Sequence, residues 1–190
     1  MQIRLAQLSD AGGIARVHVD TWRASYRGII PDAHLDSLSY EQREQRWRDN
    51  FAGFGPDVFM YVATDDDSRV IGFAGGGPER GGDPTYKGEL YALYLLQSYQ
   101  RQGIGRELTR TVAHHLAKQG HSSMLAWVLA QNPSRKFYEA LGGQPPGTGL
   151  GCNLEIRVKR QGFLKALDRL LDLACACQGI ALFPKAVNDP

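Results

Sequence analysis

The hydrophobic and polar positions of the chain follow two different periods, which predicts a mixture of strands and helices. Short runs rich in β-branched and aromatic residues predict strands at 2–5, 58–64, 70–74, 89–96, 123–129 and 154–158. Apolar residues at helical spacing predict helices that follow Ser9-Asp10 and Ser39, and helices at 104–116, 134–141 and 163–177. We find no internal repeat and no linker between these elements. The order of elements therefore predicts a mixed α/β fold with one central sheet.

Glycine and aspartate clusters punctuate the middle of this pattern. The turn residues 65–68 lie between two predicted strands and indicate a β-hairpin. Gly75-Gly76-Gly77 and Gly81-Gly82, together with Pro78 and Pro84, predict a loop after the second strand of that hairpin.

Length and composition narrow the class of protein. The 190 residues exceed a single domain of about 150 residues by roughly 40. A formal net charge of +2 gives no support for a nucleic-acid-binding protein. The three cysteines, at 152, 175 and 177, are too few for a disulfide framework. The sequence has neither a recognisable signal peptide nor an apolar run of membrane-spanning length, so we expect a cytoplasmic protein without a membrane partner.

The segment 100–105, Gln-Arg-Gln-Gly-Ile-Gly, connects a predicted strand to a predicted helix. Free amide groups and the positive end of the helix dipole make such a junction an anion-binding site, and Arg101 and Arg106 add positive charge. A P-loop is excluded because Arg106-Glu107 follows the second glycine. A dinucleotide fingerprint is weak because Leu108 replaces its third glycine, and a plain tight turn is the structural alternative.

Three motifs in order resemble one family. Gln-x-x-Gly-x-Gly after a strand resembles the acetyl-CoA pyrophosphate loop of the GNAT superfamily of N-acetyltransferases. Residues 132–143, with an Asn, a Phe-Tyr pair and a closing Gly, resemble its second motif. Residues 17–28 look like its first helix and substrate loop. The resemblance covers about residues 1–158.

This resemblance implies a single α/β (α+β) domain over residues 1–158. Its twisted, mixed sheet would be mostly antiparallel, with splayed central strands and flanking helices. After Gly143 the family usually has two strands that complete the sheet, but the prolines and glycines of residues 144–153 leave one, at 154–158. Residues 159–190 would form an amphipathic helix and tail that pack on the domain or on a second copy, as in a homodimer.

The resemblance also implies acetyl-CoA as cosubstrate and no metal. The five histidines lack metal-ligand spacing. The pyrophosphate would lie on the backbone amides of the glycine loop, and the pantetheine arm would pair with the central strand. The cofactor-binding residues are then Leu93, Leu95, Gln100, Arg101, Gln102, Gly103, Ile104, Gly105, Arg106, Asn132 and Ser134. Asn132 has an ordinary helix cap as its alternative role.

Two residues would carry the acid and base chemistry. The resemblance makes Glu89 the general base, acting directly or through an ordered water, and Tyr138 the general acid that protonates the leaving thiolate. The alternatives are a solvated strand-end carboxylate for Glu89 and a packed core residue for Tyr138.

The acceptor would bind near the first helix, where Trp22, Tyr26 and Tyr91 are its candidate contacts. Strand alternation predicts that Tyr91 and Tyr94 lie on opposite faces. The predicted reaction is direct attack of a primary amine, of a small molecule or a peptide, on the thioester. The alternatives are a non-catalytic acyl-CoA-binding sensor module and a protein N-terminal or lysine acetyltransferase. A closed aromatic pocket would favour a small amine.

Overall fold

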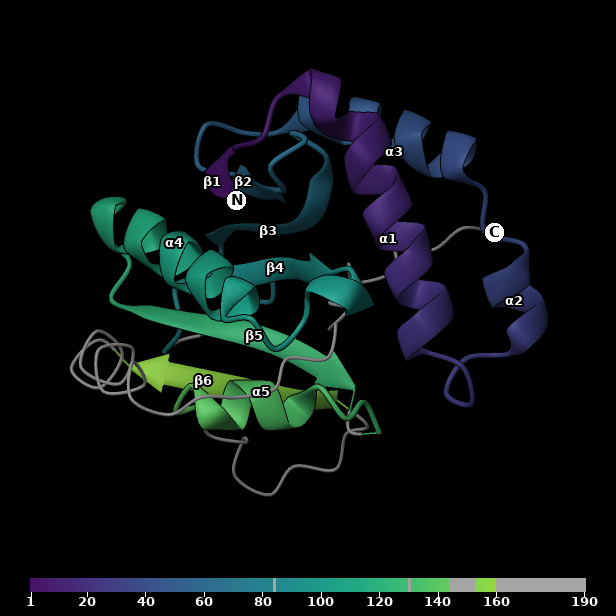
Figure 1. Ribbon diagram of the computed structural model, residues 1–190. Coiled ribbons are helices and arrows are strands. Elements are labelled where there is room, and N and C mark those ends of the chain that lie inside the picture. The colour runs from purple at the N-terminus through teal and green to yellow at the C-terminus, as the bar shows by residue number, and fades with distance from the viewer. Residues whose placement is uncertain (84, 130, 144–152, 160–190) are drawn as a thin grey trace.

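The fold is built on a twisted sheet with helices on both faces (Figure 1). A computed structural model describes residues 1–83, 85–129, 131–143 and 153–159. Six strands lie in sequence order across the sheet. They are β1 (Gln2–Leu5), β2 (Phe59–Thr64), β3 (Val70–Pro78), β4 (Gly88–Leu95), β5 (Ser123–Leu129) and β6 (Asn153–Lys159). Neighbours are antiparallel except β4 and β5, which run parallel, so the predicted mixed and mostly antiparallel sheet is confirmed.

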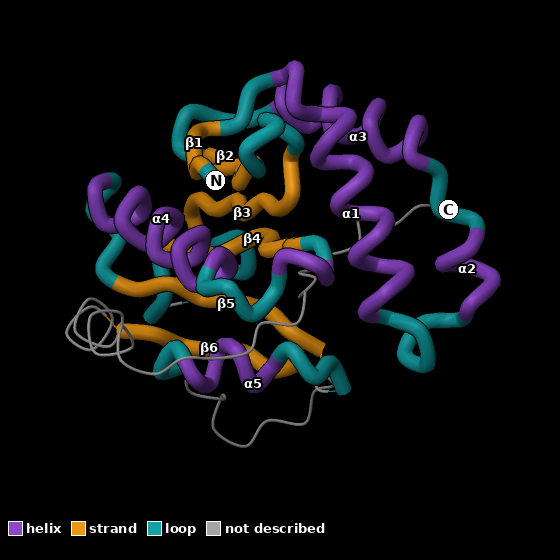
Figure 2. Tube along the Cα trace, in the orientation of Figure 1, coloured by secondary structure: helices purple, strands orange, loops and turns teal. Residues whose placement is uncertain are grey.

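The helices lie where the periodicity predicts them, with one addition (Figure 2). They are α1 (Ala11–Ser25), α2 (Asp32–Asp36), α3 (Tyr40–Gly53), α4 (Ile104–Lys118) and α5 (Arg135–Ala140). Two short 3₁₀ turns, η1 (Leu8–Asp10) and η2 (Gln97–Tyr99), precede α1 and follow β4. The five-residue α2 was not predicted, because its short sequence carries too little periodicity.

The cap expected at Ser9-Asp10 is not made by a side chain. Asp10 occupies the N-cap position of α1, but its side chain forms no cap hydrogen bond. Its carboxylate instead accepts two hydrogen bonds from the guanidinium of Arg4, at 2.7 and 2.8 Å. This bidentate ion pair ties the start of α1 to β1.

The two central strands separate part-way along their length. β4 pairs with β5 from Gly88 to Leu90 only, opposite Met124 to Ala126. Across β3 the register shifts at the same point, because Gly75 pairs with Ala92 and Gly76 pairs with Leu90. Tyr91 is therefore the extra residue of a β-bulge, which twists β4 away from its neighbour. The splayed central strands implied by the family resemblance are confirmed.

The glycines at 75–77 belong to β3, so the loop predicted for them is wrong. Glycine is disfavoured in strands because it has no side chain to pack, and this preference underlies the error. Here neighbouring groups fill the space that a side chain would need. A Cβ at Gly76 would lie 2.8 Å from the carbonyl oxygen of Glu89, and one at Gly77 would lie 2.6 Å from the hydroxyl of Tyr91.

Two hydrophobic cores cover the two faces of the sheet. One lies under α4 and α5 and takes Leu93 and Leu95 from β4. The other lies under α1 and α3 and takes Tyr94 from the same strand. The side-chain alternation of β4 thus sends neighbouring residues into different cores.

Several predictions concern parts of the chain with fewer described residues. The final strand predicted at 154–158 is confirmed by β6. The predicted helix at 163–177 and all three cysteines lie outside the described residues.

No helix in the described part of the chain has the length and apolar character needed to cross a membrane. The same part of the chain contains no group of three or more residues suited to hold a metal ion.

Candidate active site

The glycine loop forms the junction between β4 and α4, as its sequence predicts. Gly103 is the N-cap residue of α4 and has a φ of 83°, in the left-handed region that favours glycine. Ile104 and Gly105 form the buried first turn of the helix, and Arg106 follows them. The first amide groups of α4 have no partner within the helix and lie at the positive end of its dipole. This junction can therefore bind an anion.

Two glutamine side chains hold this loop in shape. Gln100 donates from Nε2 to the carbonyl oxygen of Leu95 at 3.0 Å. Gln102 donates from Nε2 to the carbonyl oxygen of Ser98 at 3.2 Å. The glutamines thus fix the path of the loop relative to the end of β4, and Arg101 is left at the loop surface.

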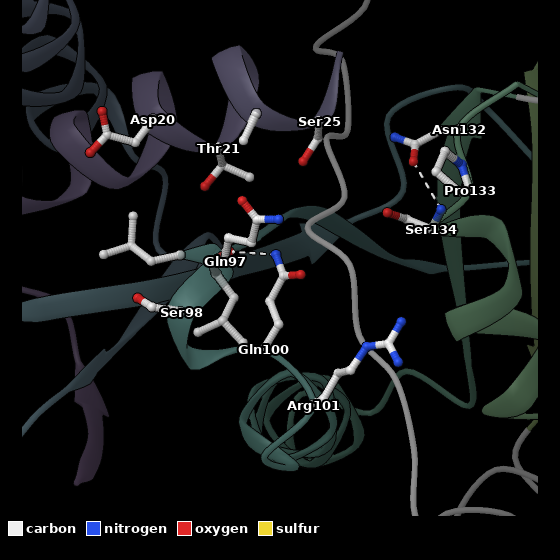
Figure 3. Close-up of a pocket in the computed structure, with 13 residues that line it drawn as sticks. Asp20, Thr21, Ser25, Gln97, Ser98, Gln100, Arg101, Asn132, Pro133 and Ser134 are labelled. Carbon is white, nitrogen blue, oxygen red and sulfur yellow. Dashed lines mark hydrogen bonds between the residues drawn. The ribbon is translucent and has the colours of Figure 1, made fainter. Parts of the chain in front are cut away.

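A cavity of about 830 Å³ lies beside this loop, between α1, the end of β4 and the start of α5 (Figure 3). It brings together five of the residues predicted to bind the cofactor: Leu95, Gln100, Arg101, Asn132 and Ser134. Sequence analysis did not predict the contributions of α1, which are Asp20, Thr21, Ala24 and Ser25. Leu93 does not line this cavity and, like Leu95, belongs to the core under α4.

Asn132 lines this cavity, and only one of its two side-chain amide atoms has a hydrogen-bond partner among the described residues. It is 1% exposed, and its Oδ1 accepts a hydrogen bond from the amide of Ser134 at 2.9 Å. Its Nδ2 has no hydrogen-bond partner among the described residues. In Figure 3 the Nδ2 points away from Ser134, toward α1. The N-cap residue of α5 is Ser134, so the Oδ1 of Asn132 closes a turn just before the helix and does not cap it. The Nδ2 remains available to a ligand.

Tyr138 lies one helical turn beyond Ser134 on α5. Its side chain is 3% exposed, belongs to the core under α4, and packs edge-on against Phe137 at a ring-centroid distance of 5.2 Å. Residues four positions apart lie on one face of a helix. Tyr138 is therefore on the same face as Ser134, which lines the cavity.

Glu89, the predicted base, is buried and ion-paired. Its side chain is 2% exposed, and the Nη2 of Arg80 lies 2.5 Å from its Oε1. The Nε and the backbone amide of Arg80 each donate to its Oε2 at 3.1 Å. The alternative of a solvated strand-end carboxylate is therefore wrong. Glu89 lines neither this cavity nor the second one described next.

A second cavity, of about 900 Å³, lies between α1, α3 and the bulged part of β4. We call it the aromatic cavity. Its aromatic lining residues are His18, Trp22, His34, Trp47, Phe54, Phe59, Tyr91 and Tyr94. Tyr91 and Tyr94 both line it, so the prediction of opposite faces is wrong; the bulge at Tyr91 breaks the strand alternation. Tyr26 is fully buried and lines neither cavity.

Hydrogen bonds and stacking fix two tyrosines of this wall. Trp22 donates from Nε1 to the hydroxyl of Tyr94 at 3.0 Å, which ties α1 to β4. Tyr91 donates to the carbonyl oxygen of Pro78 at 2.5 Å and lies under the guanidinium of Arg80, whose Cζ is 3.9 Å from its ring centroid. Burial raises the pKa of Tyr91 to about 12, so its hydroxyl keeps its proton at neutral pH.

The two cavities share their framework. α1 gives Thr21 to the first cavity and Trp22 to the aromatic cavity. β4 gives Leu95 to the first and Tyr94 to the second. Neighbouring residues of α1 and β4 therefore reach different cavities, beside the part of β4 that has separated from β5.

Comparison with known proteins decides the family. Residues 19–143 match the family model described as the acetyltransferase (GNAT) family. The chain belongs to the GNAT family of acetyltransferases. A curated relative, the uncharacterized N-acetyltransferase YuaI of Bacillus subtilis (strain 168), is 46% identical over 178 residues, which cover 90% of this chain and 98% of the relative.

More distant matches agree with this membership. The mycothiol acetyltransferase of Rhodococcus opacus (strain B4) is 34% identical over 133 residues, which cover 62% of this chain and 43% of that protein. Among solved structures, the PaiA N-acetyltransferase of Thermoplasma acidophilum in complex with coenzyme A superposes with a TM-score of 0.69 at 23% identity. The match covers 84% of this chain and 99% of that one, and it confirms the GNAT fold.

Sequence reasoning missed two polar residues of the aromatic cavity in this GNAT enzyme. His18, on α1, is 7% exposed and stacks on Tyr94 at a centroid distance of 4.6 Å. Burial, and then the charge of Arg43, lower the pKa of His18 well below its usual value, so the imidazole is neutral.

Arg43, on α3, is the other. Its Cζ lies 5.9 Å from the ring centroid of Trp22. The only signal in the sequence is the four-residue spacing of Arg43 and Trp47, which puts both on one face of a predicted helix.

Proposed function

We propose that this GNAT acetyltransferase transfers the acetyl group of acetyl-CoA to the primary amine of a small molecule bound in the aromatic cavity. The observation that carries the proposal is the arrangement of the two cavities on one framework. The first borders the anion-binding loop, the second has an aromatic wall, and both are lined by α1 and β4. An acyl group bound along β4 from the first cavity can then be approached by an amine from the second cavity.

The residues present fit acetyl-CoA. Its phosphates require an anion site, which the start of α4 and Arg101 supply. Its pantetheine amides require donors and acceptors, and the Nδ2 of Asn132 is a buried donor without a partner among the described residues. β4 pairs with β5 only as far as Leu90. The backbone of β4 after Leu90 can therefore pair with an extended chain such as pantetheine. Two solved GNAT structures contain coenzyme A or acetyl-CoA, which supports the same assignment.

The thioester supplies the acetyl group: a bond forms between the amine nitrogen and the carbonyl carbon, and the carbon–sulfur bond breaks. The chain has to accept the proton lost by the amine and to provide one to the thiolate. We assign the first task to Glu89, acting through a water, because Arg80 covers its carboxylate. We assign protonation of the thiolate to Tyr138, because it shares a face of α5 with Ser134, which lines the first cavity.

The aromatic lining of the acceptor site favours a small amine over a peptide. Eight of its nineteen lining residues are aromatic, and buried contacts such as that between Trp22 and Tyr94 fix their rings. Such rings suit an apolar side chain, whereas a peptide needs an extended polar groove.

Release of free thiol from acetyl-CoA tests this function. The enzyme is assayed with a panel of polyamines, amino acids, aminoglycosides and short peptides. We expect amine-dependent thiol release with at least one small amine and with no peptide. Saturable binding of acetyl-CoA without thiol release for any amine would contradict the proposal and favour a non-catalytic sensor module. Release with peptides alone would favour a protein acetyltransferase.

A further inference from the structure

The aromatic cavity contains an arginine that has no acidic partner among the described residues. Arg43 of α3 lines the cavity and is half-buried beside the ring of Trp22. In the described part of the chain, its guanidinium takes part in no hydrogen bond or ion pair. Burial lowers the pKa of Arg43, and the nearby charge of Arg46 lowers it further. A guanidinium nevertheless stays protonated in proteins, so a positive charge faces the cavity.

The acidic residues that line this cavity are hydrogen-bonded to groups other than Arg43 and Arg46. Glu79 accepts a hydrogen bond from the amide of Asp83 at 2.8 Å, within its own loop. Asp49, which lines the cavity, accepts one from the Nε2 of Gln45 on the same helix at 2.9 Å. The third cavity arginine, Arg80, is neutralised by Glu89. The charges of Arg43 and Arg46 are therefore left without a carboxylate among the described residues.

The neighbouring wall also contains buried hydrogen-bond donors that have no acceptor among the described residues. The Nε1 of Trp47, a group that can only donate, has no partner among the residues described. Both ring nitrogens of His18 are likewise without a partner in that part of the structure, and the two rings lie 5.9 Å apart. A buried donor without an acceptor is costly, and an anionic ligand would reduce this cost.

We infer that Arg43 binds the carboxylate of the acceptor, and that the acceptor is an amino acid or an amino-acid-like molecule with an apolar or aromatic side chain. A guanidinium holds a carboxylate through two parallel hydrogen bonds, and the aromatic wall packs against the side chain. The inference rests on the proposed function, because it names the substrate class of that site. It also predicts discrimination, because an uncharged analogue leaves Arg43 without a counterion.

A binding measurement tests the inference without turnover. The probes are N-acetyl-L-phenylalanine, its uncharged amide, and the corresponding leucine pair. Binding is followed by tryptophan fluorescence, since Trp22 and Trp47 line the cavity. We expect each acid to bind at least about tenfold more tightly than its amide. Equal affinity of acid and amide, or no binding of either acid, would overturn the inference.

Two variants on the same helix locate the effect. Arg43→Gln should remove the preference for the acid and leave the affinity for the amide within about twofold. Arg48→Gln is the matched control, because Arg48 lies on α3 and pairs with Glu44 outside the cavity. It should keep the preference. A preference that survives in Arg43→Gln, or that disappears equally in Arg48→Gln, would contradict the role of Arg43.

Turnover then separates this inference from the proposed function. Thiol release is compared for L-phenylalanine and L-phenylalaninamide, with Arg43→Gln beside the wild-type enzyme. Selective binding of the acid without turnover of any amine would support the inference and overturn the proposed function. Turnover of uncharged amines without selective binding of the acid would do the reverse. Inorganic phosphate that competes with the amides as strongly as the acids do would assign the site to phosphate-type anions and overturn the carboxylate assignment.

Discussion

The guanidinium of Arg80 holds the carboxylate of Glu89, with 2.5 Å between Nη2 and Oε1. The two residues differ in exposure, since the side chain of Glu89 is 2% exposed and that of Arg80 is 40% exposed. Arg80 also covers the ring of Tyr91 at the rim of the aromatic cavity. It therefore links the proposed base to the acceptor site.

Substitutions of Arg80 and of Glu89 should differ in their effects on stability and on catalysis. Arg80→Gln leaves a buried carboxylate without its cation and should lower the free energy of unfolding by about 2 kcal/mol. Glu89→Gln removes the charge itself and should cost less stability, but it should lower kcat by about a hundredfold. Urea denaturation and steady-state kinetics measure the two effects. A Glu89→Gln enzyme with the kcat of the wild type would remove Glu89 from the mechanism.

Stability should depend on pH through His18. Its folded-state pKa lies well below the value of about 6.5 for an unfolded histidine, so the unfolded chain binds this proton first as the pH falls. The contribution is fully present above pH 6.5 and is lost progressively as the pH falls toward the folded-state pKa. The slope from this group reaches at most about 1.4 kcal/mol per pH unit.

Denaturation at a series of pH values tests this dependence. His18→Phe should flatten the acid side of the stability curve. His114→Gln, at an exposed position of α4, is the control and should leave the curve unchanged. Parallel curves for the wild type and His18→Phe would show that His18 does not carry the effect.

A substitution of Asn132 can remove the Nδ2 donor and keep the oxygen of the side chain. Asn132→Asp retains an oxygen that accepts from the amide of Ser134 but loses the Nδ2 donor. We expect affinity for coenzyme A to fall by about tenfold, and the melting temperature to fall as well, because the new carboxylate is buried without a cation. Asn132→Ala should lose both affinity and stability. Calorimetry would contradict the assignment if Asn132→Asp bound coenzyme A as tightly as the wild type.

Tyr138 should matter for turnover and not for binding. Tyr138→Phe keeps the ring in its core position and removes only the hydroxyl. We expect kcat to fall by at least about tenfold, with the dissociation constant of acetyl-CoA changed by less than about twofold. Tyr61→Phe, whose hydroxyl contacts His115 on α4, is the control and should keep full activity. Equal kcat values for both variants would exclude Tyr138 as the acid.

The strands, the longer helices and the anion-binding loop could be predicted from the sequence because their signals are local. Gly103 lies at a left-handed position where glycine is needed, directly before a strongly periodic helix. The family motifs then placed Asn132 and Ser134 at the same cavity as Gln100.

The features that escaped prediction depend on contacts between distant segments. The glycines of β3 are explained only by the groups that lie against them, such as the Tyr91 hydroxyl beside Gly77. The bulge that brings Tyr91 and Tyr94 into one cavity follows from pairing between β3 and β4. Arg43 enters the site because α3 packs beside α1, a relation that helical periodicity alone does not contain.

Transfer of a labelled acetyl group tests the central claim most directly. The enzyme is incubated with acetyl-CoA carrying ¹³C in the acetyl group and with the best amine of the panel, and the products are identified by mass spectrometry. We predict a labelled N-acetyl product and an equal amount of free coenzyme A, both lost in the Gly103→Glu/Gly105→Glu variant. Free thiol without a labelled amide, or the same yield from the variant, would contradict the claim that acetyl-CoA binds at this loop and acetylates an amine.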